Sequence, residues 1–126
     1  MKRIFTFLSL LIVLTSFTVL SGLDEVVSAM KTGNFTTVSK YFDKNVEISM
    51  PDKTNSYSKS QAALVLKDFF TTNSVSGFDI IHKGESGGSQ YCIGTLKSKN
   101  GQYRTTIFMK QKADGQVLQE LRFENR

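Results

Sequence analysis

The spacing of apolar residues changes along this chain near residue 77. Before that point, apolar residues mostly recur every three or four positions, which is typical of helices with one buried face. After it, they alternate with polar residues, which is typical of strands with one buried face. The pattern therefore predicts an α+β domain in which the helices come first and most of the strands come last.

Three helices are predicted before the change. The first starts near Gly22 and stops at Gly33, and the second follows Asn34, a residue type that suits a helix N-cap. Ser58 and Gln61 match a capping box, in which each side chain bonds to the other's backbone, and open a third helix that reaches about Thr72. Their apolar faces consist of Leu23, Val26, Val27 and Met30; of Phe35, Val38, Tyr41 and Phe42; and of Ala62, Ala63, Leu66, Phe69 and Phe70.

The strands are predicted from alternation and from the turn residues that separate them. Asp43-Lys44-Asn45 is predicted to turn the chain into a strand over Val46–Met50, and Thr54–Tyr57 could pair back as a short second strand. Gly87-Gly88, Asn100-Gly101 and Asp114-Gly115 are hairpin turn sequences. They separate four further strands that form an antiparallel meander: Phe78–Gly84, Gln90–Ser98, Gln102–Lys112 and Gln116–Glu124.

Turn lengths then predict which residues oppose each other in the meander. A loop over residues 86–88 pairs His82 with Cys92, and a two-residue turn over residues 100–101 pairs Cys92 with Met109. Two registers are open for the last hairpin, because a two-residue turn puts Ile107 opposite Arg122 and a three-residue loop puts it opposite Leu121. We choose the loop, over residues 113–115, because it keeps one face of the sheet apolar.

These registers place one polar row across the core face of the meander, namely His82, Cys92, Met109 and Gln119. Directly opposed side chains have Cβ atoms about 4.5–5.5 Å apart, so His82 could lower the pKa of the Cys92 thiol and activate it. The alternatives are a half-buried row in which His82 is only hydrogen-bonded, and a row of ligand contacts in a pocket.

The opposite face of the meander is predicted to carry four apolar residues among charged ones. Apolar residues ringed by charge are typical of a modest protein interface, although scattered exposed apolar residues are also normal. We take this face as a candidate homodimer interface, formed by Tyr91, Ile93, Phe108 and Leu118.

Residues 1–21 are predicted to be a signal peptide. Lys2 and Arg3 are followed by an apolar stretch over residues 4–20, and Ser21 and Gly22 are small residues that suit cleavage. An uncleaved membrane anchor is the alternative, but the stretch is only about long enough to span a bilayer and is diluted by hydroxyls. We therefore expect a mature domain over residues 22–126, exported to the periplasm or the extracellular space, with no stable membrane span after cleavage.

Charge and composition exclude several classes of site. Loss of Lys2 and Arg3 lowers the formal net charge from +5 to +3, which is too weak a bias for a nucleic-acid partner. Cys92 is the only cysteine and His82 the only histidine, so neither a disulfide framework nor a zinc site of the usual spacing can form. No Gly-rich phosphate loop or calcium loop is present, and we expect no metal or cofactor.

The order of the elements resembles the nuclear transport factor 2-like superfamily, whose members are cone-shaped α+β domains. The residues that carry the resemblance are GNFTTVSKYFDKNVEISMP at positions 33–51, SKSQAALVLKDFF at positions 58–70, and LQELRFENR at the C-terminus. More narrowly, the chain is similar to a small secreted Bacteroidota family of unknown function. The resemblance covers residues 22–126 and implies a strongly curved antiparallel sheet, formed by the meander plus an early strand or hairpin and covered by three N-terminal helices.

The resemblance also implies where a site would lie. Tyr41 and Phe42 would stand at the rim of the cone, and with the polar row they define a candidate ligand pocket of Tyr41, His82, Cys92, Met109 and Gln119. Isomerase-like relatives use a Tyr and a protonated acid as oxyanion donors, but Asp43 beside Tyr41 is predicted to be a turn residue. Dehydratase-like relatives use an Asp/His pair, and no Asp is placed beside His82. We therefore assign no catalytic residue.

Three functions remain open from the sequence. The first is an exported, non-catalytic domain that binds a small apolar ligand or a protein partner in the cone or on the sheet face. The second is an isomerase- or hydrolase-like enzyme that uses His82 with Cys92 or Tyr41. The third is a structural homodimer without a ligand. A cone filled by its own side chains would argue against the ligand and enzyme hypotheses.

Overall fold

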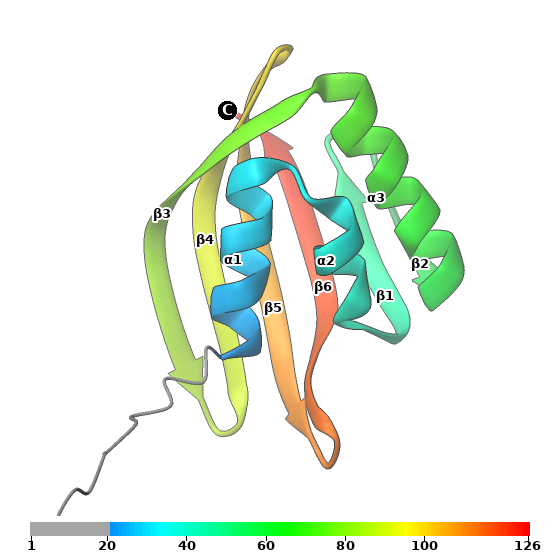
Figure 1. Cartoon of the computed structure of the whole chain (residues 1–126), viewed down its shortest axis with the longest axis vertical. Helices are drawn as coiled ribbons and strands as arrows, with labels where there is room; N and C mark the ends of the chain where they lie inside the picture. Colours follow the sequence, from blue (N-terminus) through cyan, green and yellow to red (C-terminus); the bar gives the residue numbers. More distant parts are fainter. Residues whose placement is uncertain (1–20) are drawn as a thin grey trace, which may run out of the picture.

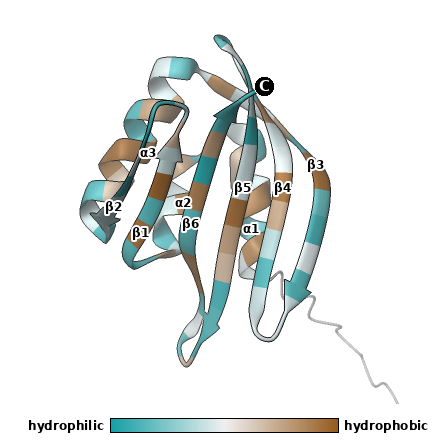
Figure 2. Ribbon diagram, turned by 180° about the vertical axis from the view of Figure 1, so that it is seen from behind, coloured by the Kyte–Doolittle hydropathy of each residue, from teal (hydrophilic) through white to brown (hydrophobic). Residues whose placement is uncertain are grey.

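The computed structural model describes residues 21–126, so the predicted signal peptide lies outside the described residues except for Ser21. Three helices lie on one face of a six-stranded sheet, and the other face is not covered by any described helix (Figures 1 and 2). The predicted α+β class is confirmed. The elements are α1 (Gly22–Thr32), α2 (Phe35–Lys40), β1 (Phe42–Met50), β2 (Lys53–Ser58), α3 (Lys59–Asn73), β3 (Val75–Ser86), β4 (Ser89–Ser98), β5 (Gly101–Lys112) and β6 (Gly115–Asn125).

The first two helices begin and end at the capping residues that the sequence indicates. The N–H of Asp24 donates to Ser21 Oγ at 3.1 Å at the start of α1. Gly33 ends that helix with φ 70°, a left-handed conformation that glycine adopts without steric cost. The N–H of Thr37 donates to Asn34 Oδ1 at the start of α2.

The third helix starts at the predicted capping box and ends one residue beyond the predicted end. Gln61 and Ser58 exchange their side-chain and backbone bonds as expected. The left-handed cap at the C-terminus is Ser74, with φ 50°, and not Asn73. The Asn73 side chain is instead buried, donating to the carbonyl of Phe69 at 2.8 Å and accepting from the Tyr103 hydroxyl at 3.1 Å. It therefore ties the end of α3 to the sheet.

The order of strands across the sheet is β2-β1-β6-β5-β4-β3. β3 to β6 form the predicted antiparallel meander, and β1 and β2 form a hairpin at the other edge, so the short second strand is confirmed. β1 lies parallel to β6, so the sheet is mixed and not wholly antiparallel as predicted. The parallel pair is feasible because β2, α3 and β3 to β5 lie between its two strands in sequence.

The first strand begins earlier than the alternation predicts. β1 starts at Phe42, so Asp43-Lys44-Asn45 lies within the strand, and the predicted turn there is wrong. The physical reason is a tertiary contact, since the N–H of Leu118 in β6 donates to the carbonyl of Tyr41 at 2.6 Å. This bond brings the chain into the sheet directly after α2.

The predicted registers are partly right. Ile107 opposes Leu121 and Thr105 opposes Phe123 as predicted, but the predicted loop over residues 113–115 is wrong, since Lys112 pairs with Gly115 across a two-residue turn and the bulge at Gln119 restores the predicted pairing. Cys92 opposes Ile107 and not Met109, because Ser98 pairs with Gly101 and the turn over residues 99–100 is one residue earlier than predicted. The pairing therefore slips by two residues. An even slip keeps every side chain on its predicted face.

Two β-bulges change the faces of residues that the sequence assigned by strict alternation. In β3, Ile80 opposes Gly94 but His82 opposes Ile93, so Ile81 is an extra residue. In β6, Leu118 opposes Met109 but Glu120 opposes Phe108, so Gln119 is an extra residue. An extra residue reverses the alternation beyond it. The bulges therefore separate His82 from Cys92 and turn Leu118 toward the core.

The core lies between the helices and the sheet face that they cover. Phe69 of α3 packs on Phe123 of β6 with ring centroids 4.6 Å apart, and Phe70 lies against the same ring at 6.5 Å. The residues with 0% exposure come from both layers and leave the cone filled by its own side chains: Val26, Met30, Val38, Val46, Ala62, Leu66, Cys92, Leu96, Ile107, Met109, Leu118, Leu121 and Phe123.

Candidate functional site

The interior of the cone, where the ligand pocket is predicted, is densely packed. Cys92 and Met109 are both completely buried, in contact with the core cluster that includes Ile107 and Leu121. Burial raises the pKa of the Cys92 thiol to about 11, because the charged thiolate loses its hydration. This thiol is therefore protonated at neutral pH and inert as a nucleophile.

Hydrogen-bonded polar side chains connect α1 to the end of the sheet that carries the β3–β4 and β5–β6 turns. Tyr41, half-buried at the end of α2, donates from its hydroxyl to Glu25 of α1, and this bond raises the pKa of Tyr41 to about 12. Gln116 of β6 donates to Gln90 Oε1 of β4 at 2.6 Å and accepts from the N–H of Leu23 at 3.2 Å. These bonds join α1 to the two hairpin ends of the sheet. Tyr41 thus stands at the rim as predicted, while its neighbour Phe42 is buried in the core.

Asp43 joins three strands near this end of the sheet. Its Oδ2 accepts from Lys112 Nζ at 2.9 Å and from Gln119 Nε2 at 3.1 Å, and its Oδ1 accepts from the N–H of Lys44 at 2.8 Å. The bond from Lys112, followed by those from Gln119 and Lys44, lowers the pKa of Asp43 to about 2. Asp43 is therefore an ionised structural anchor, and the bulged Gln119 is one of its partners.

His82 lies on the exposed side of β3. Its Nε2 is 2.9 Å from the Tyr91 hydroxyl, and the two rings are 5.5 Å apart. Because of the bulge at Ile81, His82 does not oppose Cys92, so the predicted polar row is wrong. The structure does not bring Tyr41, His82, Cys92, Met109 and Gln119 into one pocket: two are buried in the core, two bond to separate acids, and His82 is on the exposed face.

The uncovered face of the sheet gathers three of the four predicted interface residues. Tyr91 and Phe108 are directly opposed on β4 and β5, and Ile93 follows Tyr91 on the same side of β4. Leu118 is buried at 0% exposure, so its predicted place at the interface is wrong. The bulge at Gln119 puts Val117 on the uncovered face instead, beside Lys110. We call Tyr91, Ile93, Phe108 and Val117, all half-buried, the outer-face cluster.

Charged residues surround the outer-face cluster in two groups. Three basic residues lie on β4 and β5, and three acidic residues lie on β6 and β1, with the basic Arg122 among those of β6 and the acidic Asp79 beside β4 on β3. Arg122 bonds to Glu120 at 2.7 Å, and Lys97 bonds to Asp79 of β3 at 2.8 Å. The basic group is Lys97, Arg104 and Lys110, and the acidic group is Glu47, Glu120 and Glu124.

The alternation pattern gave no indication of a groove between α3 and the β1–β2 hairpin. Its cavity of about 320 Å³ is lined by Met50 and Tyr57 of the hairpin and by Val65 and Phe69 of α3, with polar residues at its edge. Val65 and Phe69 are four residues apart, a spacing that places both on one side of the helix. The four-residue spacing of Val65 and Phe69 is visible in the sequence. The groove itself exists only because the β1–β2 hairpin packs opposite this side of α3.

Two further properties limit the chemistry of the described residues. Within residues 21–126, the His, Cys, Asp and Glu side chains form no group of three that could hold a metal ion. In the same range, every helix is too short or too polar to cross a membrane.

The chain is similar to proteins of one family. The family model described as a domain of unknown function, DUF4783, matches residues 23–124. A search of curated proteins found no similar sequence.

Solved structures give the same answer. A DUF4783 family protein from Bacteroides ovatus is 30% identical, with a TM-score of 0.78, and the match covers 81% of this chain and 93% of that one. One from Bacteroides fragilis is 29% identical, with a TM-score of 0.76 and coverage of 81% and 96%. A nuclear transport factor 2-like protein of unknown function from Cytophaga hutchinsonii is 13% identical, with a TM-score of 0.60 and coverage of 85% and 91%, and shows the shared fold alone.

Proposed function

Because the chain belongs to the DUF4783 family of domains of unknown function, with a nuclear transport factor 2-like fold, we propose that it is an exported, non-catalytic binding domain. It acts through a protein contact on the uncovered face of its sheet, and the partner is a second copy of the same chain. The observation that supports this most is the outer-face cluster, a group of half-buried apolar side chains. It lies on the face of the sheet that no described helix covers (Figure 2).

The charges around the cluster favour a second copy as the partner. A two-fold axis parallel to the strands would place the acidic residues of β6 and β1 opposite the basic residues of β4 and β5 in the other copy. Because Lys97 and Glu120 already bond to Asp79 and Arg122 within the chain, the charges available to meet across the axis are Arg104, Lys110, Glu47 and Glu124, each meeting its opposite twice in an isologous interface. A sheet face that pairs in this way is complementary to itself.

The face is large enough for a stable contact. Strands β1, β6, β5, β4 and β3 lie about 4.8 Å apart, and each is roughly ten residues long at about 3.3 Å per residue. The face that they form therefore has an area of roughly 800 Å². A standard interface buries about 800 Å² on each partner. Dimerisation would therefore use most of the uncovered face, with Phe108 near its middle.

The absence of catalysis is supported by the positions of the groups that could perform it. The Cys92 thiol is buried with its pKa raised, and His82 contacts Tyr91 on the other side of the sheet. Tyr41 and Asp43 are each bound to a partner that keeps Tyr41 protonated and Asp43 ionised at neutral pH. These contacts therefore do not place an activated nucleophile beside a general base.

The substitution Phe108→Asp tests the dimer. We expect the unsubstituted protein to elute and scatter light as a dimer, and the variant to remain folded by circular dichroism but become a monomer. The matched control is Leu64→Asp, because Leu64 is 66% exposed on α3, on the opposite layer. An unsubstituted protein that is monomeric at the highest attainable concentration would overturn the proposal, as would equal dissociation by both substitutions.

Export is supported by the basic start and apolar stretch of residues 1–21. Cell fractionation followed by N-terminal sequencing tests it. We expect the chain in the exported fraction with a new N-terminus near Ser21 or Gly22, and an uncleaved chain in the cytoplasm would refute export.

A second function, binding of a small apolar ligand, is favoured by the groove between α3 and the β1–β2 hairpin. Met50 and Tyr57 line one side of this groove, and Val65 and Phe69 line the other. The apolar lining continues into the core, since Phe69 also packs on Phe123. Native mass spectrometry of the purified protein should detect a bound molecule, which Val65→Trp should displace by filling the groove. A spectrum without any bound mass would count against this function.

A further inference from the structure

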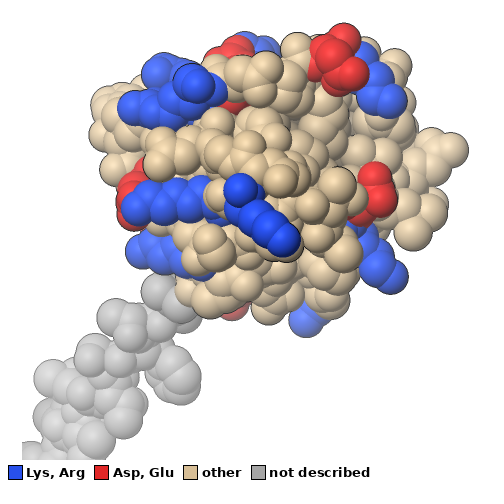
Figure 3. Space-filling model, turned by 90° about the horizontal axis from the view of Figure 1, so that it is seen from above, with Lys and Arg blue, Asp and Glu red and all other residues tan. Residues whose placement is uncertain are grey.

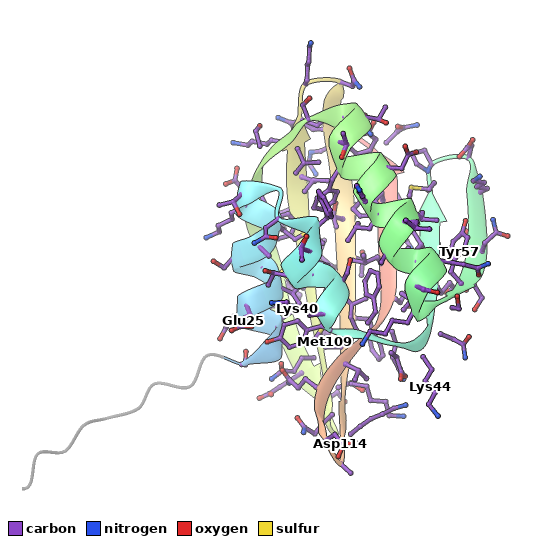
Figure 4. The ribbon with its side chains drawn as sticks, turned by 45° about the vertical axis from the view of Figure 1, so that its right-hand side comes forward. Glu25, Lys40, Lys44, Tyr57, Met109 and Asp114 are labelled. Carbon is purple, nitrogen blue, oxygen red and sulfur yellow. The ribbon has the colours of Figure 1, made fainter. Side chains whose placement is uncertain are left out.

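Three lysines line a second groove, on the helical side of the molecule. It lies between the C-terminal half of α2, the start of β1 and the first turn of α3, with a volume of about 770 Å³. Figure 4 shows Lys40 at the end of α2 and Lys44 near the start of β1, at the same end of the molecule. We call it the lysine groove, and it is lined by Lys40, Lys44, Lys59, Thr36, Ser39, Ser58, Ser60 and Ala63.

No acidic residue lines this groove in the described part of the chain. The acid adjacent in sequence, Asp43, is bound to Lys112 and Gln119, and Glu25 accepts the bond from Tyr41. Lys112 neutralises Asp43, and Glu25 lies outside the groove, in a neighbouring hollow that Lys40 also lines. Three lysines therefore line one open hollow, and within residues 21–126 none of them forms an ion pair.

Within residues 21–126, the lysines that form ion pairs with an acid are Lys83, Lys97 and Lys112. Lys83 lies 2.9 Å from Asp24, and Lys97 lies 2.8 Å from Asp79. Basic and acidic side chains are also mixed over the end of the molecule that Figure 3 shows. Like charges placed together repel each other, so a groove with three lysines and no acid attracts an anion.

We propose that the lysine groove binds the phosphate group of an anionic ligand. Lysine is a point charge with three donors that suits a phosphate oxygen, and hydroxyl groups donate to the same oxygens. Ser58 Oγ accepts from the N–H of Gln61, which leaves its own hydrogen available to donate. That capping bond already satisfies the N–H of Gln61, so the site depends on side chains and not on the end of the helix.

Two sources of the phosphate share this chemistry, a soluble phosphate compound and the headgroup of an anionic phospholipid. The groove is open at the surface, and the neighbouring Leu64 of α3 is 66% exposed. A soluble compound would contact the groove alone. A lipid surface would also contact Leu64.

Binding is measured on the purified protein in two arms. In the first, inorganic phosphate is titrated at constant ionic strength while backbone amide shifts are recorded by NMR. In the second, the protein is sedimented with vesicles of phosphatidylglycerol or of phosphatidylcholine. We expect saturable shifts around the groove in the first arm, or sedimentation with phosphatidylglycerol only in the second. The arm that responds identifies the source.

The decisive comparison is between two double variants of equal charge. Lys44→Gln with Lys59→Gln removes two groove lysines, and Lys31→Gln with Lys99→Gln removes two exposed lysines elsewhere. Each exposed lysine contact is expected to contribute about twofold to fivefold in affinity, so the groove variant should bind roughly fivefold to twentyfold more weakly. The control should change by less than about twofold.

Three results would overturn the proposal. One is equal weakening by both double variants, which would show that only net charge matters. Another is no saturable binding in either arm. The third is amide shifts that lie away from the groove. All four lysines are exposed, so both variants should keep the circular dichroism spectrum of the unsubstituted protein.

Discussion

Replacing Asp43 by Asn tests whether this carboxylate anchors the start of β1. Asn keeps the side-chain shape, but its single oxygen can accept either from the N–H of Lys44 or from Gln119, which bond to different carboxylate oxygens of Asp43, and it loses the negative charge that binds Lys112. The substitution therefore removes the ion pair with Lys112 together with one neutral hydrogen bond. The Asp43 side chain is 16% exposed, so most of its interaction with Lys112 is shielded from water on its own side.

The expected loss follows from the pKa. Asp43 has a pKa of about 2 in the folded chain, against about 3.9 in an unfolded one, and that difference corresponds to at most about 2.5 kcal/mol. Lys112 is 47% exposed, and solvent screens the pair, so we expect a loss of about 1–2 kcal/mol at neutral pH. Because the folded pKa is lowered, this stability is complete above about pH 5 and disappears as the pH falls toward about 2.

Urea denaturation at about pH 7 and about pH 2.5 measures the effect. The difference in unfolding free energy between the unsubstituted protein and Asp43→Asn should shrink at the lower pH to about a third of its value at the higher pH. Asp114→Asn is the control, because Asp114 is exposed in the β5–β6 turn. Equal acid sensitivity of the unsubstituted protein and Asp43→Asn would refute the reasoning.

Two other predictions concern buried groups. Leu118→Ala should cost about 2–5 kcal/mol of unfolding free energy because Leu118 has 0% exposure, whereas Leu64→Ala, at 66% exposure, should change it by less than about 0.5 kcal/mol; equal effects in urea melts would place Leu118 at the surface. Cys92 should react with an aromatic disulfide reagent only when the protein unfolds, because its thiol is buried and its pKa is raised to about 11. Absorbance measurements should show slow labelling of the thiol in buffer and rapid labelling in denaturant. Immediate labelling in buffer would contradict the burial of Cys92.

The fold could be predicted because several local signals agreed with one another. The capping box at Ser58, the glycine at residue 33 and the change of period near residue 77 each depend on residues close together in sequence. Such signals act through backbone conformation and hydrogen bonds over a few residues. The pairing of β4 with β5 is shifted by two residues from the predicted one. This shift did not change the predicted buried face, because an even number of residues leaves each side chain on the same side of the sheet.

The candidate pocket could not be predicted because it depended on two strands without bulges. The extra residues, Ile81 and Gln119, are not glycines, and although the alternation breaks beside both of them, it does not show which residue is extra. Gln119 bonds to Asp43, a residue far away in sequence, and that tertiary contact holds it out of the regular alternation. Both grooves were missed for a similar reason, since each lies between segments whose closeness is decided by packing.

By itself, the sequence determined the helices, the meander and which residues are apolar enough to fill a core, because period, caps and turns are local properties. Only the tertiary structure decided the parallel contact of β1 with β6, the two bulges and the packed interior of the cone. These features depend on contacts between residues distant in the chain, and one extra residue in a strand is enough to exchange its two faces. In this protein, the bulges move His82 to the exposed face and Leu118 to the core, so the predicted pocket does not form. The uncovered sheet face and the grooves between elements remain as surfaces for binding.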